Sequence, residues 1–241
     1  MSAAFTALIT AHLLGSFAMP SNWTARASRI YALFLHSALI AFLSCFLLGS
    51  LHWEILLIVF AARLILGSIE ARHISNSAAP FVSLQFLHLA VVFCLAFAFP
   101  DTAKNGWWIA DIASEWSRRY FAALSSISGI ILCVPFGGIL IARLISPFNE
   151  EIRCDDIAGL MQGGQYIGWL ERILVMLLLL INQPNGIGFL IAAKSILRFG
   201  EIRDASQRRV AEYIIIGTFL SFGWALVVSV LTQKTLQYWM P

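Results

Sequence analysis

Long apolar runs separated by short polar segments dominate the sequence. They predict helices over residues 3–19, 30–50, 51–69, 81–100, 120–146, 166–182, 185–199 and 211–233. Most of these runs approach the ~20 residues with which a helix crosses a bilayer. They are also too long and too continuously apolar for the alternating strands of a membrane barrel. The pattern therefore predicts an all-α, polytopic transmembrane helical bundle with about eight spans.

The seventh run is the shortest. From Gly186 to Phe199 it has about 14 residues, which is roughly 21 Å of helix. It therefore either crosses with help from its neighbours or forms a re-entrant segment buried in protein.

Composition agrees with a membrane protein. The chain has 241 residues, of which 59% are hydrophobic and 12% charged, whereas soluble domains are about 25% charged. The net charge of +3 comes with no basic run, so nucleic acid is not an expected partner. The first run lacks a basic lead and a convincing cleavage site, so we expect a mature helix there rather than a signal peptide. The four cysteines form no CxxC pair and are interpreted as packing residues.

Basic residues in the connecting segments predict the orientation. One side of the predicted bundle collects Arg26, Arg29, Arg72, Arg143, Arg153, Arg198, Arg203, Arg208 and Arg209. The other side has only Lys104, Arg118, Arg119 and Lys234. The first side is therefore expected to be cytoplasmic, with both termini outside; a re-entrant seventh run would move the C-terminus inside.

Four parts follow from this pattern. Residues 1–100 form a four-helix membrane unit, and 101–119 an outer interfacial loop with Trp108, Ile112 and Trp116 on one helix face. Residues 120–165 hold a fifth span kinked at Pro135 and an acidic cytoplasmic loop, either a solvated connector or a docking surface. Residues 166–241 form a helical hairpin and the last span.

Charged residues interrupt the hairpin. Reflecting Glu171 through the INQPNG turn places it level with Lys194 and Arg198, which share one helix face. Arg172 faces elsewhere, toward Glu212. We call these five residues the C-terminal charge cluster. It is either a clasp that fixes the hairpin near the interface or the lining of a polar cavity.

A second polar level is predicted in the N-terminal half. The same reflection through successive turns places five polar side chains from four helices at a similar depth. We call these residues the N-terminal polar cluster: His12, His36, Arg63, Gln85 and His88. Such a cluster is either glue between helices or a pocket for an anionic or hydrogen-bonding group. His12, His36 and His88 are the only metal candidates, for zinc. However, no carboxylate accompanies them, and Arg63 would repel a cation.

Several segments carry a resemblance to a known family. They are AHLLGSF (11–17), LH (35–36), ARLILGSIEAR (62–72), FVSLQFLH (81–88), IGWLERIL (167–174), IGFLIAAKSILRFGEI (187–202) and EYIIIGTFLS (212–221). Together they resemble the bacterial integral-membrane family catalogued as domain of unknown function 3307.

This chain departs from the pattern of that family at four positions. Where the family has acids it has Ser16, Gly67 and Leu84, and where the family has a third-helix histidine it has Arg63. The resemblance therefore implies a divergent member in the bacterial inner membrane, with no reaction to transfer.

Three functions follow as hypotheses. The leading one is a non-catalytic inner-membrane protein that senses, binds or interacts, with a polar intramembrane pocket and no cofactor. The second is a small-solute carrier or channel, and the third a divergent metal-dependent hydrolase. The lipid bilayer is one expected partner; a second copy or another membrane protein is left open.

Overall fold

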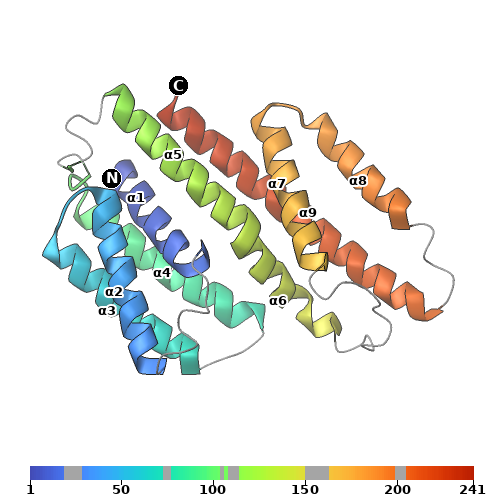
Figure 1. Ribbon diagram of the computed structural model, residues 1–241, viewed down its shortest axis with the longest axis horizontal. Coiled ribbons are helices and arrows are strands. Elements are labelled where there is room, and N and C mark those ends of the chain that lie inside the picture. The colour runs from blue at the N-terminus through green and yellow to red at the C-terminus, as the bar shows by residue number, and fades with distance from the viewer. Residues whose placement is uncertain (19–28, 73–76, 104–105, 108–113, 150–162, 199–204) are drawn as a thin grey trace. The chain divides into compact units, whose positions relative to one another are not determined.

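The structure is a computed structural model of residues 1–241, and it describes all of them except 19–28, 73–76, 104–105, 108–113, 150–162 and 199–204. The described residues form helices and turns, without a strand. In chain order the elements are α1 (Ser2–Leu13), η1 (Leu14–Ala18), α2 (Arg29–Leu48), α3 (Trp53–Arg72), α4 (Ala78–Ala98), α5 (Glu115–Ile131), η3 (Leu132–Phe136), α6 (Gly137–Asn149), α7 (Gly163–Leu180), α8 (Asn185–Arg198) and α9 (Ala205–Trp239) (Figure 1). The expected helical class is confirmed.

In the part of the chain that the structure describes, five helical segments are long and apolar enough to cross a membrane: Ile30–Leu48, Ala78–Ala98, Glu115–Pro147, Gly163–Leu180 and Glu212–Trp239. Ser2–Ala18 and Asn185–Ile196 are apolar but shorter. Helix α3 has 20 residues, yet every 18-residue stretch of it holds three of the charged residues Glu54, Arg63, Glu70 and Arg72. Length and composition thus support five crossings. The expected eight are not confirmed, because two of the other helices are short and one is highly charged.

The chain separates into two compact units by its internal contacts. Unit 1 comprises Met1–Ser75, Ala79–Ile131 and Thr235–Pro241, and unit 2 comprises Asn76–Ala78 and Leu132–Lys234. The division therefore falls inside the predicted fifth span rather than after residue 100. Residues 150–162 of the acidic loop lie outside the described residues, as do 104–105 and 108–113 of the interfacial loop.

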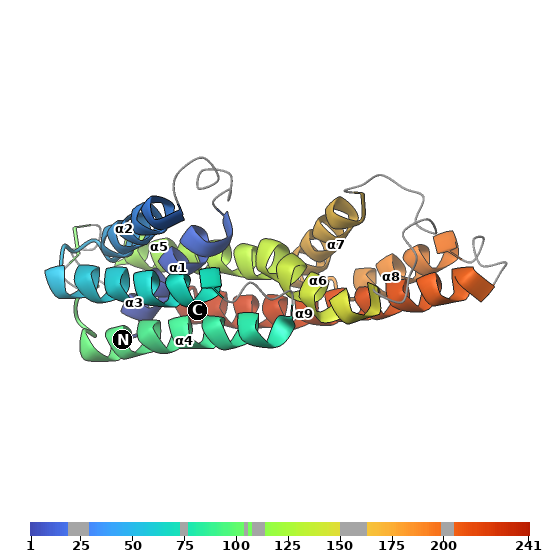
Figure 2. The same cartoon turned by 90° about the horizontal axis from the view of Figure 1, so that it is seen from below.

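Helix α1 is the best-buried helix of unit 1. Its residues Ala3, Ala4, Ala7, Leu8 and Ala11 are each at most 5% exposed. Alanines allow neighbouring backbones to approach closely, and α1 contacts both α2 and α5 (Figures 1 and 2). The core of unit 1 is thus built around a short helix at the beginning of the chain.

Unit 2 contains Pro135, where the sequence predicts a kink. The helix turns from α to π over Leu132–Phe136, a segment that includes this proline. Proline has no N–H to donate, so carbonyls near it need other partners. The indole Nε1 of Trp224 donates to Leu132 O at 2.8 Å, and Cys133, Val175 and Phe222 pack into the apolar core of the unit.

Gly15 lies where η1 passes α2, and it generates a stability prediction. A Cβ at Gly15 would overlap Cγ1 of Ile40. We expect Gly15→Ala to lower the free energy of unfolding by about 1–3 kcal/mol, the usual cost of overpacking. Unfolding of the purified protein by sodium dodecyl sulfate measures the change.

The control is Gly223→Ala, because no atom lies within 4 Å of a Cβ at that position. This substitution should be neutral or stabilising, since alanine favours a helix interior. In an Ile40→Ala background, Gly15→Ala should lose most of its cost. An equal cost in both backgrounds would show that the Ile40 contact is not the cause.

Candidate functional site

The N-terminal polar cluster is drawn from four helices of unit 1. His12 lies at the end of α1 and His88 in α4, and their rings are 5.0 Å apart between centroids. Both are well buried, at 6% and 4% exposed. Gln85, one turn before His88, reaches the His12 ring. Arg63, near the middle of α3, acts electrostatically on His12, His36 and His88. The structure thus brings these residues to one level.

Arg63 is held by a hydroxyl rather than a carboxylate. Its Nη2 donates to Ser16 Oγ at 2.5 Å. Among the described residues the ion pairs join His52 to Glu54, Arg119 to Glu115 and Lys194 to Glu171, and none involves Arg63. The guanidinium therefore has no ion pair with a described carboxylate, and Glu70 on the same helix acts on it only electrostatically.

His88 has one ring nitrogen in use. Its Nδ1 lies 2.9 Å from Leu84 O, one turn earlier in α4. A carbonyl oxygen can only accept a hydrogen bond, so Nδ1 carries the hydrogen and donates. In a neutral ring the other nitrogen, Nε2, is then a bare acceptor.

Three buried polar atoms of this cluster have no hydrogen-bond partner: Arg63 Nε, Gln85 Oε1 and His88 Nε2. Only four further side-chain atoms in the described part of the chain share that condition. Buried polar atoms normally find partners, and leaving one without costs about 1–3 kcal/mol. The cluster is therefore equipped to bind a polar group that supplies both an acceptor and donors.

The metal hypothesis requires three ligands at one point. His12 and His88 are neighbours, but within the described residues no group of three or more His, Cys, Asp or Glu is placed to hold a metal ion. His36, on α2, is only partly buried and does not complete such a group. The three histidines that were the candidates for zinc are therefore not placed as one group of ligands among the described residues.

The C-terminal charge cluster contains one close ion pair. Lys194 Nζ on α8 lies 2.7 Å from Glu171 Oε2 on α7, and the two side chains are 24% and 13% exposed. Lys194 also lies 6.0 Å from the centroid of the Phe222 ring on α9. This pair joins the two arms of the hairpin, as the clasp interpretation requires.

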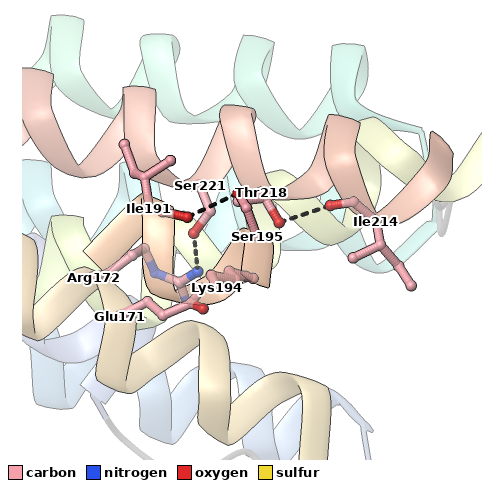
Figure 3. A network of polar contacts seen from close by, with 8 residues as sticks. All are labelled: Glu171, Arg172, Ile191, Lys194, Ser195, Ile214, Thr218 and Ser221. Carbon is pink, nitrogen blue, oxygen red and sulfur yellow. Dashed lines mark hydrogen bonds and ion pairs between the residues drawn. The ribbon is translucent and has the colours of Figure 1, made fainter. Parts of the chain in front are cut away.

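Arg172 points away from that pair, toward α9 (Figure 3). It is 4% exposed, and its guanidinium donates to Ser221 Oγ at 3.0 Å and to Val134 O at 3.2 Å. A Cβ at Gly138 or Gly168 would lie 3.1 or 3.2 Å from the guanidinium nitrogens, so both glycines make room for it. Arg172 therefore braces the π-helical segment at Pro135.

The expected contact from Arg172 to Glu212 is not formed, because Ser221 and Val134 take its hydrogen bonds. Glu212 is exposed at the side-chain level. The Arg198 side chain lies outside the described residues, so its predicted place beside Glu171 stays a prediction.

Two residues of these sites were missed by the sequence reasoning. Ser16 is four residues after His12, on the same helix face, and stands where the resembled family has an acid. That spacing was the available signal. Ser221 ends the EYIIIGTFLS segment, but nothing in its spacing indicated Arg172 as a partner.

The chain matches no known family, no curated protein and no solved structure. The geometry of the two clusters therefore carries the functional argument.

A double-mutant cycle tests the hairpin clasp. We expect Glu171→Gln and Lys194→Met to show a coupling energy of about 1–3 kcal/mol, because the pair is largely shielded from solvent. The matched control is the exposed i,i+4 pair Glu115–Arg119, whose side chains are 72% and 64% exposed. Its coupling should stay below about 0.5 kcal/mol. Equal couplings would contradict a special role for the clasp.

Arg172→Lys tests the brace. Lysine carries one compact ammonium and cannot reach both acceptors as the planar guanidinium does. We expect a loss of about 1–3 kcal/mol in the free energy of unfolding, since an acceptor is left unpaired. Arg119→Lys at the exposed pair should change it by less than about 0.5 kcal/mol. Equal losses of unfolding free energy in the two variants would show that Arg172 does not brace the π-helical segment.

Proposed function

We propose that this chain is a multi-pass inner-membrane protein that binds or senses a small polar or anionic group at the N-terminal polar cluster, without catalysis. We also propose that the chain crosses the membrane eight times and that it belongs to the bacterial family that it resembles. The three buried atoms without partners, Arg63 Nε, Gln85 Oε1 and His88 Nε2, carry the argument.

The energetics of a membrane interior support binding at this cluster. No water is at hand there to satisfy a polar atom, so intramembrane charges are rare and tend to serve a function. Arg63 adds a positive charge without a paired carboxylate in the described structure. A bound group that is negative or strongly polar would satisfy these atoms together.

The chemistry of the cluster favours binding over catalysis. Hydrolysis needs a nucleophile beside a base. Ser16 Oγ accepts a hydrogen bond from Arg63, and no hydrogen bond among the described residues joins this hydroxyl to the rings of His12 or His88, so no hydroxyl nucleophile is paired with a base here. A bound group would therefore be held rather than attacked.

A carrier or channel is the second candidate, favoured by the π-helical break over Leu132–Phe136. Broken helices line the substrate sites of many secondary transporters. This candidate expects solute flux into liposomes that falls in both Arg63→Ala and Glu171→Ala, whereas a binding protein without transport shows no flux in either.

A ligand screen tests the proposed function. Thermal unfolding of the detergent-purified protein is followed with methyl phosphate, methyl sulfate, hydrogencarbonate, acetate and small alcohols. We expect at least one solute to raise the midpoint, because a ligand at a hundred times its Kd stabilises by about 2.7 kcal/mol. That gain should disappear in Arg63→Met.

The control is Arg119→Met, which removes an exposed arginine outside the cluster and should keep the gain. If no solute stabilises the wild type more than Arg63→Met, the binding function is wrong.

A further inference from the structure

We propose that the N-terminal polar cluster selects a phosphate group that carries a single negative charge and keeps at least one O–H, either free or as a monoester. The inference deepens the proposed function and rests on it. It names the chemistry of the ligand from the donors and acceptors that the cluster leaves free.

His88 supplies the first constraint. Its Nδ1 donates to Leu84 O, so the free Nε2 presents a lone pair in a neutral ring. The residue is 4% exposed and stands beside the cationic Arg63, where a second positive charge would be unfavourable. Nε2 therefore requires a hydrogen from the ligand, and an oxygen without one would be repelled.

Arg63 supplies the opposite constraint. Its Nη2 is taken by Ser16, while Nε has a hydrogen to donate and no acceptor. A guanidinium matches oxyanions in both charge and geometry. Arg63 therefore requires an oxygen that carries negative charge, and one negative charge on the ligand balances its own.

Gln85 adds a second acceptor, Oε1, which has no hydrogen-bond partner in the structure although this side chain reaches the His12 ring. The ligand thus meets one cationic donor and two acceptors. A singly charged phosphate offers oxygens to Arg63 and its one or two O–H groups to His88 and Gln85.

Most other ligand classes fail one of these constraints. Metal cations are repelled by Arg63. Sulfate and carboxylate bring no hydrogen for His88 or Gln85. Neutral alcohols leave the guanidinium charge unbalanced. Hydrogencarbonate brings one negative charge and one O–H, as a singly charged phosphate monoester does, so it is the nearest rival and is separated from phosphate only by measurement.

Methyl phosphate and methyl sulfate form the matched pair of probes. The singly charged forms have similar shape and equal charge, and differ by the O–H. At pH about 6, near the second pKa of a phosphate monoester, roughly half of the methyl phosphate keeps that hydrogen. We expect methyl phosphate to bind at least about tenfold more tightly, because methyl sulfate leaves buried acceptors unpaired. Isothermal titration calorimetry of the detergent-purified full chain measures both.

Three outcomes separate this inference from the proposed function. Equal binding of the two esters would mean that charge alone is recognised, which overturns the phosphate assignment and leaves the binding function standing. Binding of hydrogencarbonate without methyl phosphate would do the same. If neither ester nor any other solute of the screen binds, both proposals are wrong.

Ser16→Asp and Ser16→Asn provide a second test that does not remove the cluster. The carboxylate introduced by Ser16→Asp would face Arg63 in place of the hydroxyl, and so take the position of the ligand charge. We expect Ser16→Asp to lose methyl phosphate binding at least about tenfold, while the neutral Ser16→Asn, of the same size, stays within about threefold of wild type. Unimpaired binding in Ser16→Asp, in a variant with an intact unfolding transition, would overturn the inference.

Nanodiscs that contain one of two anionic lipids distinguish a lipid headgroup from a soluble phosphate as the ligand. Phosphatidic acid has a phosphate monoester, and phosphatidylmethanol is a diester without the O–H. If phosphatidic acid blocks methyl phosphate binding and phosphatidylmethanol does not, the ligand is a lipid headgroup. If neither lipid blocks it, the ligand is a soluble phosphate. Blocking by both lipids alike would contradict selection by the O–H.

Discussion

A polar atom inside a membrane has no water to bind and must find its partner within the protein. The hydroxyls of Thr10, Ser44 and Ser229 each donate to the carbonyl four residues earlier. Where the helix breaks at Pro135, the side chains of Trp224 and Arg172 bond to carbonyls of the broken segment. The free atoms of the N-terminal polar cluster differ from this pattern. They are the part of the described structure where several polar atoms without partners lie together.

The two clusters contain similar charged residues, but the partners of these residues differ. Glu171 and Lys194 neutralise each other across the hairpin, and Arg172 uses its guanidinium on Ser221 and Val134. One atom of this arrangement, Arg172 Nε, is buried without a hydrogen-bond partner, whereas the N-terminal polar cluster has three such atoms from three side chains. Arg63, by contrast, meets only a hydroxyl. The difference lies in the neighbours that each cation has, because burial is common to both sites.

Much of the fold could be predicted from apolar run length, since a run of about 20 residues has few alternatives to a helix. The number of crossings stays a prediction, because α3 carries several charges and α8 is short. Reflection through the turns estimates depth, and it placed His12, Arg63 and His88 at one level. Reflection does not determine the direction in which a side chain points around the helix axis. Arg172 was therefore assigned to Glu212, whereas its acceptor Val134 O belongs to a backbone break whose geometry no residue pattern specifies.

The central place of α1 also determines the order in which unit 1 can assemble during translation. Thr10 bonds to Leu124 and Ser128, which are 114 and 118 residues further along the chain. Ser2 meets Tyr238 across a separation of 236 residues, and Trp239 stacks on Phe121. Within this chain, α1 is therefore made before the helices that hold these partners. Thr10 is without them until α5 has been made, and the contacts to Tyr238 and Trp239 form only after α9 has been made.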